Sequence, residues 1–286
     1  MIATLKDRYI GCMPGLAVGD ALGAQVEFME RDSFPTVTEM VGGGVHRLKA
    51  GEWTDDTSMA LCLAVSLLAC EGFNVADQMQ RYCDWYKHGY MSSNGECFDI
   101  GNQTREALER YLRTGKTALA APEAAGNGCI MRLAPVTLYF FPDYGAMNHY
   151  SMQSAVLTHN NLQCLATTGQ LSMLIAQMLD ATKKPNISFD HHRSEVKSTG
   201  FVVDTLDAAR WAFRATDTFE HAIIAAVNLG GDADTIGAVT GQLAGAYYGA
   251  SAIPARWLDK LAHRDMIIDL AVGLYEKKLP ERYKQI

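Results

Sequence analysis

Two segments of the chain carry a glycine at every fourth position, and this pattern constrains the fold more than any other feature. The first segment has Gly11, Gly15, Gly19 and Gly23, and the second has Gly237, Gly241, Gly245 and Gly249. Because residues four apart share one face of an α-helix, each segment predicts a helix with a stripe that has no side chains. Glycine inside a helix costs up to about 1 kcal/mol relative to alanine. We therefore expect close packing of these two helices at the centre of the fold to compensate.

The direction in which the two helices cross decides which acidic residues meet. If they are antiparallel, Glu27 beyond the first stripe lies beside Asp232 and Asp234 at the start of the second. Pro14 falls inside the first helix, and proline interrupts an α-helix unless it stands in the first turn. The sequence leaves a kink and a late helix start equally open.

The rest of the chain has a mainly helical period, with little strand-like alternation. It predicts an all-α fold, with one compact multi-helix domain over residues 1–286. The polar stretch 182–200 is interpreted as an exposed loop inside that domain. The predicted helices span roughly 4–25, 56–70, 75–88, 101–113, 129–139, 147–158, 161–181, 201–214, 218–228, 234–249, 254–261 and 264–276.

Charge and composition exclude several classes of function. The 286 residues include 25 Lys and Arg against 32 Asp and Glu, and the net charge of −7 argues against nucleic-acid binding. The chain has neither a long apolar run near its start nor a stretch of 18 uncharged apolar residues, so we expect no membrane span and a cytoplasmic location. Its 7 cysteines form an odd set without a C-x-x-C pair, which indicates reduced, packed thiols.

Two short acidic motifs each stand at a predicted helix start. Thr54, Asp55 and Asp56 precede one helix, and helix capping alone explains such residues. A second motif with Asp232, Asp234 and Thr235 follows two glycines at another helix start, and two such motifs are harder to explain by capping. Together with Glu27 they offer five carboxylates and two hydroxyls, a set of oxygen donors that suits two Mg²⁺ or Mn²⁺ ions. Neither motif has a histidine or cysteine, so zinc fits them poorly.

Three further segments supply candidate ligand contacts. Gly126, Asn127 and Gly128 run toward an apolar helix, which is either a phosphate-binding arrangement or an ordinary turn, and Arg132 pairs with a ligand or with a carboxylate of the fold. Asp99 is either a partly buried acid or an N-cap. His159 is a loop residue, a cap or a substrate contact, whereas His191 and His192 are expected to be solvated.

These motifs, in this order, resemble the ADP-ribosylglycohydrolase family over nearly the whole chain. Within the family they are most similar to the bacterial dinitrogenase-reductase-activating type. The resemblance rests on GLAVGDALGAQVEF (15–28), GEWTDDTSMALCLA (51–64), CFDIGNQTREAL (97–108), AGNGCIMRLAPV (125–136), TH (158–159) and NLGGDADTIGAVTGQLAGAYYG (228–249). It implies an all-α fold around a central dinuclear metal site. It assigns ligand roles to Thr54, Asp55, Asp56, Asp232, Asp234 and Thr235, with Glu27 beside them.

The same resemblance implies where a substrate binds. Residues assigned to ADP-ribose are Gly101, Asn102, Gly126, Asn127, Gly128, Met131, Arg132 and His159, and Asp99 matches an acid that faces the guanidinium. The chain departs from the wider family at Cys129, Pro14 and Asn160–Asn161. These departures leave every expected metal ligand in place.

The predicted reaction is hydrolysis of the bond between C1″ of ADP-ribose and an arginine guanidinium, on a protein or a small guanidine substrate, with free ADP-ribose as product. Two divalent cations, Mg²⁺ or Mn²⁺, would orient the water and stabilise an oxocarbenium-like transition state. Glu27 would accept a proton from the water, and Asp99 either protonates the leaving guanidine or opens the ribose ring. Two alternatives stay open: a relative that binds ADP-ribose without catalysis, and a hydrolase of serine-linked or nucleobase-linked ADP-ribose.

Overall fold

The computed structural model describes residues 3–117, 123–189 and 191–284. Within these residues the chain forms twelve α-helices and four short 3₁₀-helices, with no β-strand beyond two isolated bridges. The α-helices are α1 (Leu5–Gly23), α2 (Asp55–Ala69), α3 (Val75–His88), α4 (Asn102–Thr114), α5 (Ala134–Phe140), α6 (Tyr144–Val156), α7 (Leu162–Asp180), α8 (Val202–Arg214), α9 (Phe219–Val227), α10 (Ala233–Tyr248), α11 (Ala255–Leu258) and α12 (Arg264–Glu276). The predicted all-α fold is confirmed.

One predicted helix starts in the wrong place. Residues 129–139 were expected to be helical throughout, but residues 127–129 form the 3₁₀-helix η1 (Asn127–Cys129) and α5 begins at Ala134. Pro135 stands in the first turn of α5, where a proline has no N–H to lose and its fixed φ suits the helix. The proline therefore marks the helix start, which the apolar run before it obscured.

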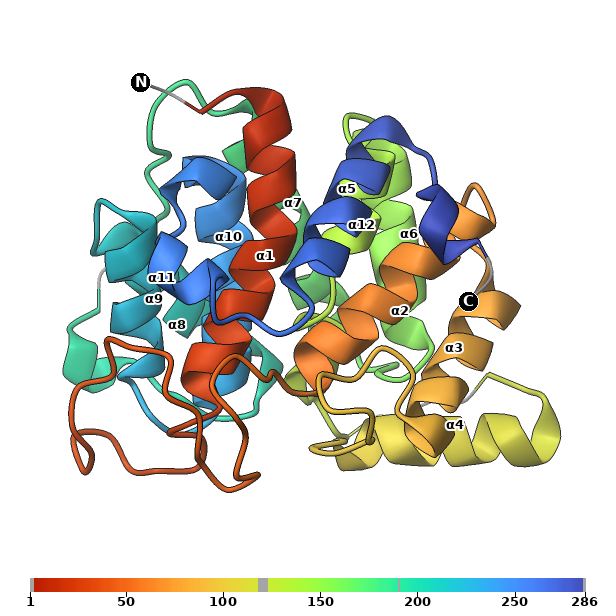
Figure 1. Ribbon diagram of the computed structural model, residues 1–286, viewed down its shortest axis with the longest axis horizontal. Helices are drawn as coiled ribbons and strands as arrows, with labels where there is room; N and C mark the ends of the chain where they lie inside the picture. Colours follow the sequence, from red (N-terminus) through yellow and green to blue (C-terminus); the bar gives the residue numbers. More distant parts are fainter. Residues whose placement is uncertain (1–2, 118–122, 190, 285–286) are drawn as a thin grey trace.

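Helices α1 and α10 lie side by side (Figure 1). Their glycine stripes face each other. A Cβ atom on Gly11 would lie 2.6 Å from the carbonyl oxygen of Gly245, and one on Gly241 would lie 2.9 Å from the amide nitrogen of Leu16. At the other end, Gly23 lies against the backbone of Ala233. The backbones of the two helices therefore touch, as the stripes predicted, and the order of the contacts makes the helices antiparallel.

Helix α1 continues through Pro14 without a break, so the late-start alternative is wrong. It begins at Leu5, where the Thr4 hydroxyl accepts a hydrogen bond from the amide of Asp7 at 3.2 Å. One contiguous apolar cluster extends from Tyr9 to Tyr283, and α1 and α10 run through it. The cysteines in the described chain are free, and five of the seven are buried. No helix among the described residues is long and apolar enough to span a membrane.

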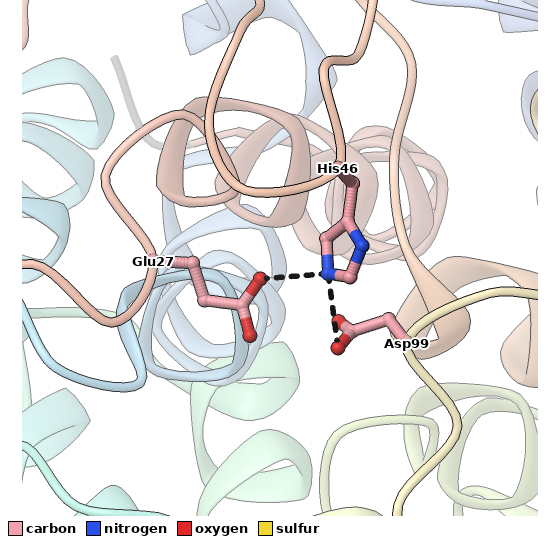
Figure 2. Close-up of side chains that lie close together, drawn as sticks. All are labelled: Glu27, His46 and Asp99. Atoms are coloured by element: carbon pink, nitrogen blue, oxygen red, sulfur yellow. Dashed lines mark ion pairs between the residues drawn. The ribbon is translucent and has the colours of Figure 1, made fainter.

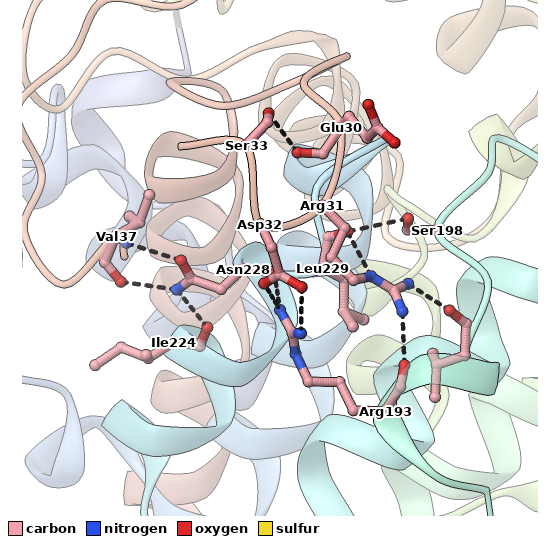
Figure 3. A network of polar contacts seen from close by, with 11 residues as sticks. Glu30, Arg31, Asp32, Ser33, Val37, Arg193, Ser198, Ile224, Asn228 and Leu229 are labelled. Carbon is pink, nitrogen blue, oxygen red and sulfur yellow. Dashed lines mark hydrogen bonds and ion pairs between the residues drawn. The ribbon is translucent and has the colours of Figure 1, made fainter. Parts of the chain in front are cut away.

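The segment 182–200 is only partly the exposed loop that its polarity predicts. His191 and His192 are exposed, but Ile187 and Val196 are each only 4% exposed. Ile187 packs in the main apolar cluster, and Val196 is held by Arg31, whose guanidinium donates hydrogen bonds to the carbonyls of Leu229, Arg193 and Val196 (Figure 3). These contacts fasten the segment to the C-terminal end of α9, and a run of residue types does not reveal such an anchor.

The anchored segment is held at a second point by a bidentate ion pair. The carboxylate of Asp32 accepts hydrogen bonds of 2.9 and 2.7 Å from the guanidinium of Arg193 (Figure 3). Both partners are substantially exposed, so the pair itself adds little stability. Its effect is positional, because it ties the loop after α1 to the loop before α8.

Candidate active site

Helices α2 and α10 begin next to each other, and the residues at their N-cap positions do not cap them. Thr54 precedes α2 and Asp232 precedes α10, yet within the described chain neither side chain accepts a hydrogen bond from its own helix. Gly230 and Gly231, with φ of 66° and 65°, turn the chain into α10. Capping alone therefore does not explain the two acidic motifs.

The side chains of the two motifs converge. The Thr54 hydroxyl lies 3.3 Å from Asp56 Oδ2 and 3.3 Å from Asp234 Oδ2, although Asp234 is 180 positions away in the sequence. The Thr235 hydroxyl lies 3.5 Å from the same oxygen of Asp56. One hydroxyl proton cannot serve two carboxylates at once, so the cluster contains more acceptors than protein donors.

Two buried carboxylate oxygens in this cluster have no partner. Within the described residues, Asp56 Oδ1 and Asp234 Oδ1 accept no hydrogen bond. Burial raises the pKa of both acids well above the usual range, and the neighbouring carboxylates raise it further. Burial is also the main cause that raises the pKa of Asp55 and the pKa of Asp232. Unpaired buried acids with only oxygen donors around them fit hard divalent cations, whose charge would reverse these pKa shifts.

Asp20 in the middle of α1 holds the start of α2 in place. It is fully buried and accepts hydrogen bonds from the amide and hydroxyl of Thr54, at 2.9 and 3.0 Å. It also accepts bonds from the amide and hydroxyl of Thr57, at 3.1 and 2.6 Å. Burial raises its pKa to about 6, and these four bonds limit the rise. Asp20 thus caps the N-terminus of α2, which the side chain of the N-cap residue Thr54 does not do.

Glu27 follows α1 and lies between the acidic cluster and a second pair of residues. One of its carboxylate oxygens is within 4.8 Å of ligand atoms of Asp232 and Asp234. On its other side, His46 Nε2 lies 3.3 Å from Glu27 Oε2 and 3.1 Å from Asp99 Oδ1 (Figure 2). Burial, followed by the charges of Asp99 and Asp232, raises the pKa of Glu27 to about 9. Glu27 therefore lies between the acidic cluster and the pair formed by His46 and Asp99.

A cavity of about 570 Å³ opens above this cluster. Its size falls in the range of small-molecule sites. The predicted site residues that line it are Glu27, Asp55, Asp99, Gly101, Asn102, Gly126, Asn127, Gly128, Met131, His159, Asp232, Asp234 and Thr235. Asp99 makes no cap for α4, whose N-cap residue is Gly101, so the N-cap interpretation of Asp99 is wrong.

The loop of Gly126, Asn127 and Gly128 forms its contacts differently from a phosphate-binding loop. The amide of Gly126 donates to Gln103 Oε1 at 2.9 Å, and the amide of Asn127 donates to the carbonyl of Gly200 at 3.1 Å. Two of its backbone donors are therefore already used. The absence of a side chain at Gly128 matters instead, because a Cβ there would lie 2.8 Å from His159 Cε1.

Comparisons with known proteins agree with this geometry. The family described as ADP-ribosylglycohydrolase matches residues 1–283. The chain belongs to the ADP-ribosylglycohydrolase family. It is 41% identical to the ADP-ribosylarginine hydrolase Tri1 of Serratia proteamaculans, over 94% of this chain and 79% of that protein. It is 37% identical to the ADP-ribosyl-[dinitrogen reductase] glycohydrolase of Rhodospirillum rubrum, over 90% and 91% of the two chains.

A solved structure confirms the fold of this glycohydrolase. The chain matches one titled "ADP-ribosylglycohydrolase-related protein complex" with a TM-score of 0.84 and 44% identity. The match covers 96% of this chain and 99% of that one. The sequence comparisons therefore support the enzyme class, and the structural comparison supports the all-α fold.

Arg132 of the glycohydrolase lies behind the cavity wall. Arg132 is fully buried and stands outside the cavity lining, with its guanidinium 5.0 Å from the ring of Tyr82. It donates a 2.6 Å hydrogen bond to the Thr158 hydroxyl, which is 2.8 Å from His159 Nδ1. Burial and Arg132 lower the pKa of His159 to about 3. Arg132 thus positions a neutral histidine on the cavity wall, and among the described residues it pairs with no carboxylate.

Asn127 contacts the acidic cluster as well as the cavity. Its side-chain amide donates to Asp232 Oδ2 at 2.6 Å and to the Thr205 hydroxyl at 2.9 Å. The first bond turns the carboxylate of Asp232 and lowers its pKa against the effect of burial. Asn127 was predicted only as a substrate contact, and in the structure it also orients a predicted metal ligand.

Sequence reasoning missed several residues of the site. Asp20 had a visible signal, because it is the one charged residue in the glycine-striped part of the first helix, residues 9–23. His46 had a weaker one, since it follows three glycines in the loop before the first acidic motif. Ser198, Thr199 and Gly200 line the cavity without any signal in their residue types.

Proposed function

We propose that the protein is a metal-dependent hydrolase that removes ADP-ribose from ADP-ribosylated arginine, on a protein or a small guanidine substrate, and releases free ADP-ribose. The observation that carries the proposal is the set of unpaired, buried carboxylate oxygens of Asp56 and Asp234, next to a cavity that Asp234 and Asp99 line. Uncompensated buried acids are costly unless a cation balances them.

The oxygen donors of the two helix starts suit two Mg²⁺ or Mn²⁺ ions. The residues that would hold them are Thr54, Asp55, Asp56, Asp232, Asp234 and Thr235. When bound, the ions supply positive charge that orients a water and the ribose hydroxyls and stabilises the transition state.

The chain's own residues supply the remaining chemistry. Glu27 is 4% exposed and lies beside Asp232 and Asp234, where its carboxylate accepts the proton of the attacking water. Asp99 lies across from Glu27, with His46 between them, and its carboxylate binds the departing guanidine by charge-assisted hydrogen bonds. His159 stays neutral and is available as a hydrogen-bonding group to the ADP-ribose moiety, together with Gly101, Asn102, Gly126, Asn127, Gly128 and Met131.

An arginine linkage is supported by the chemistry of the cavity wall. A guanidinium presents planar donors that carboxylates such as Asp99 bind well. Two of the relatives are named for ADP-ribosylarginine and for ADP-ribosyl-dinitrogen reductase. An ADP-ribosylated protein is accordingly the proposed partner, and ADP-ribose the product.

The test is release of free ADP-ribose from an ADP-ribosylarginine peptide, measured by mass spectrometry with Mg²⁺, Mn²⁺ or EDTA. We expect metal-dependent release by the wild type and loss of release in Asp232→Ala. Asp265→Asn is the matched control, because that acid is 74% exposed and lies on α12.

Other outcomes would replace the proposal. ADP-ribose that binds in saturating Mn²⁺ and is never released from the peptide would indicate a non-catalytic ADP-ribose-binding protein. Release from serine-linked or nucleobase-linked ADP-ribose, with the arginine peptide intact, would indicate a different linkage.

We also infer that residues 1–286 act as one domain, supported by the contiguous apolar cluster from Tyr9 to Tyr283. The cytoplasmic location stays a prediction from the sequence.

A further inference from the structure

His46 brings a nitrogen donor to a site otherwise made of oxygen donors. It comes from the loop between α1 and α2, and its Nε2 atom points between the carboxylates of Glu27 and Asp99 (Figure 2). The side chains of Glu27, Asp99 and His46 are 3%, 13% and 20% exposed. All three ligand atoms lie within 4.8 Å of one another.

His46 Nε2 lies within ion-pair distance of Glu27 and Asp99, but the geometry of these contacts is not that of hydrogen bonds. Among the described residues, His46 Nε2 and Glu27 Oε2 are buried and have no hydrogen-bond partner. Nε2 is 3.3 Å from Glu27 Oε2 and 3.1 Å from Asp99 Oδ1. Zinc bonds to nitrogen and oxygen ligands of about 2.0–2.1 Å place adjacent ligands of a tetrahedron about 3.3 Å apart. The two separations from His46 Nε2 therefore match the edges of a zinc tetrahedron, and the third pair of ligand atoms lies within 4.8 Å.

The backbone holds these three ligands in position. Asp99 has a left-handed φ of 58°, a conformation that costs energy at a residue other than glycine and that the surrounding structure must hold in place. The ring of His46 packs against Phe98 at 5.3 Å. Backbone hydrogen bonds between Gly43 and Leu48, of 2.7 and 2.9 Å, close the loop that carries His46.

We propose that Glu27, His46 and Asp99 form a second kind of metal site, which binds one borderline cation, with Zn²⁺ as the best fit. Imidazole selects Zn²⁺ over Mg²⁺, so this site differs in preference from the all-oxygen cluster beside it. Three protein ligands leave a fourth position for a water or a substrate atom, and two of them, Glu27 and Asp99, line the cavity. A bound Zn²⁺ occupies the carboxylates of Glu27 and Asp99 and inhibits the enzyme. Only the inhibition rests on the proposed function, whereas the binding does not.

The experiment is calorimetric titration of Zn²⁺ into the full chain in excess Mg²⁺, which fills the all-oxygen cluster. We expect one Zn²⁺ per chain. Changing a residue in the outer shell of a metal site typically weakens binding about 10–100-fold, so loss of a direct ligand in His46→Gln is expected to weaken it at least tenfold. His88→Gln is the matched control, because His88 is an exposed histidine at the end of α3.

Further variants keep the result decisive. If His46→Gln has an altered circular dichroism spectrum, Asp99→Asn tests the same site. Asp55→Asn weakens the all-oxygen cluster and is expected to leave Zn²⁺ binding intact. Equal Zn²⁺ affinity in the wild type and His46→Gln, loss of Zn²⁺ binding in Asp55→Asn alone, or no Zn²⁺ binding at all would overturn the proposal.

Inhibition is measured separately, as ADP-ribose release with and without Zn²⁺ in excess Mg²⁺. We expect Zn²⁺ to inhibit the wild type at the concentration at which calorimetry shows binding. A chain that binds Zn²⁺ through His46 and releases no ADP-ribose under any condition would refute the proposed function and leave the site standing. A chain that releases ADP-ribose equally well with the site filled would refute the inhibitory role.

Discussion

The contact between α1 and α10 leaves no room for a side chain, and Gly241→Ala tests this directly. A Cβ atom at Gly241 would lie much closer to the carbonyl oxygen of Gly15 than the 3.0 Å that such atoms keep in real proteins. Both opposing groups are backbone, so no rotamer change relieves the clash. The two helices must separate by at least about 1 Å over the length of the stripe.

The expected loss of stability is a balance of two effects. Overpacking a core costs about 1–3 kcal/mol, and a clash between two backbones belongs at the upper end of that range, about 3 kcal/mol. Alanine returns about 1 kcal/mol through its higher helix propensity. The net change in unfolding free energy is then a loss of about 2 kcal/mol, or about thirtyfold in the unfolding constant. For 286 residues this lowers the melting temperature by about 3 °C.

Urea denaturation of Gly241→Ala measures this loss, and Gly169→Ala is the matched control. Gly169 is also inside a helix, but the nearest group to its Cβ position is Asn148 Oδ1 at 2.9 Å, the end of a side chain that can move. We expect the control to be as stable as the wild type or slightly more stable. Equal stability of the two variants would refute the close-packing argument. We also expect Gly241→Ala to lose activity, because the separation moves Glu27 away from Asp232.

Three further predictions concern the acidic cluster. Asp20→Ala removes the acceptor of four buried hydrogen bonds, and only the Thr54 hydroxyl has other acceptors nearby, so we expect it to lose about 2–4 kcal/mol of unfolding free energy and about 10–100-fold in ADP-ribose release. Mn²⁺ at about 100 times its dissociation constant is expected to stabilise the protein by about 2.7 kcal/mol per ion, measured by thermal melting, and Asp234→Asn is expected to abolish most of this gain. In EDTA, stability is expected to fall as pH rises. Folded Glu27 keeps its proton from its ordinary pKa of 4.5 up to about 9, whereas the unfolded chain releases it, and denaturation at a series of pH values measures the slope.

Each of these predictions has a result that contradicts it. Wild-type activity in Asp20→Ala would show that Thr54 needs no buried anchor. The same melting temperature with Mn²⁺ and with EDTA would contradict a metal site in the cluster. Stability that rises between pH 5 and pH 9 in EDTA would contradict the proton that Glu27 is expected to keep in the folded chain.

The sequence predicted the centre of the fold because glycines at fixed spacing have few structural meanings. The stripes predicted close packing of the two helices but left their direction open. The structure shows that they are antiparallel, and this direction brings Glu27 beside Asp232 and Asp234. The acidic motifs were recognisable for a similar reason, since carboxylates crowded at two helix starts exceed what capping requires. These features are local in sequence and need no knowledge of the surrounding loops.

Contacts that depend on tertiary geometry were not predictable in the same way. Arg132 stands next to the glycine loop in sequence, but the turn of η1 and α5 directs its guanidinium into the core beside Tyr82. His46 reaches Asp99 across 53 positions, through a loop whose course depends on glycines with left-handed backbones. A residue type alone could not show either destination.

The same glycine stripes that hold the fold together also determine where chemistry is possible. Side chains cannot project from the contact between α1 and α10, so polar groups on that face are confined to the helix ends. Asp20 is the instructive exception, because it lies next to Gly19 and points toward α2 rather than α10. The stripe therefore supplies rigidity, whereas the segments at its end supply the ligands, Glu27 after α1 and Asp232 before α10. Substitutions in the stripe should change stability and activity together, whereas substitutions at His46 or Asp99 should separate the two.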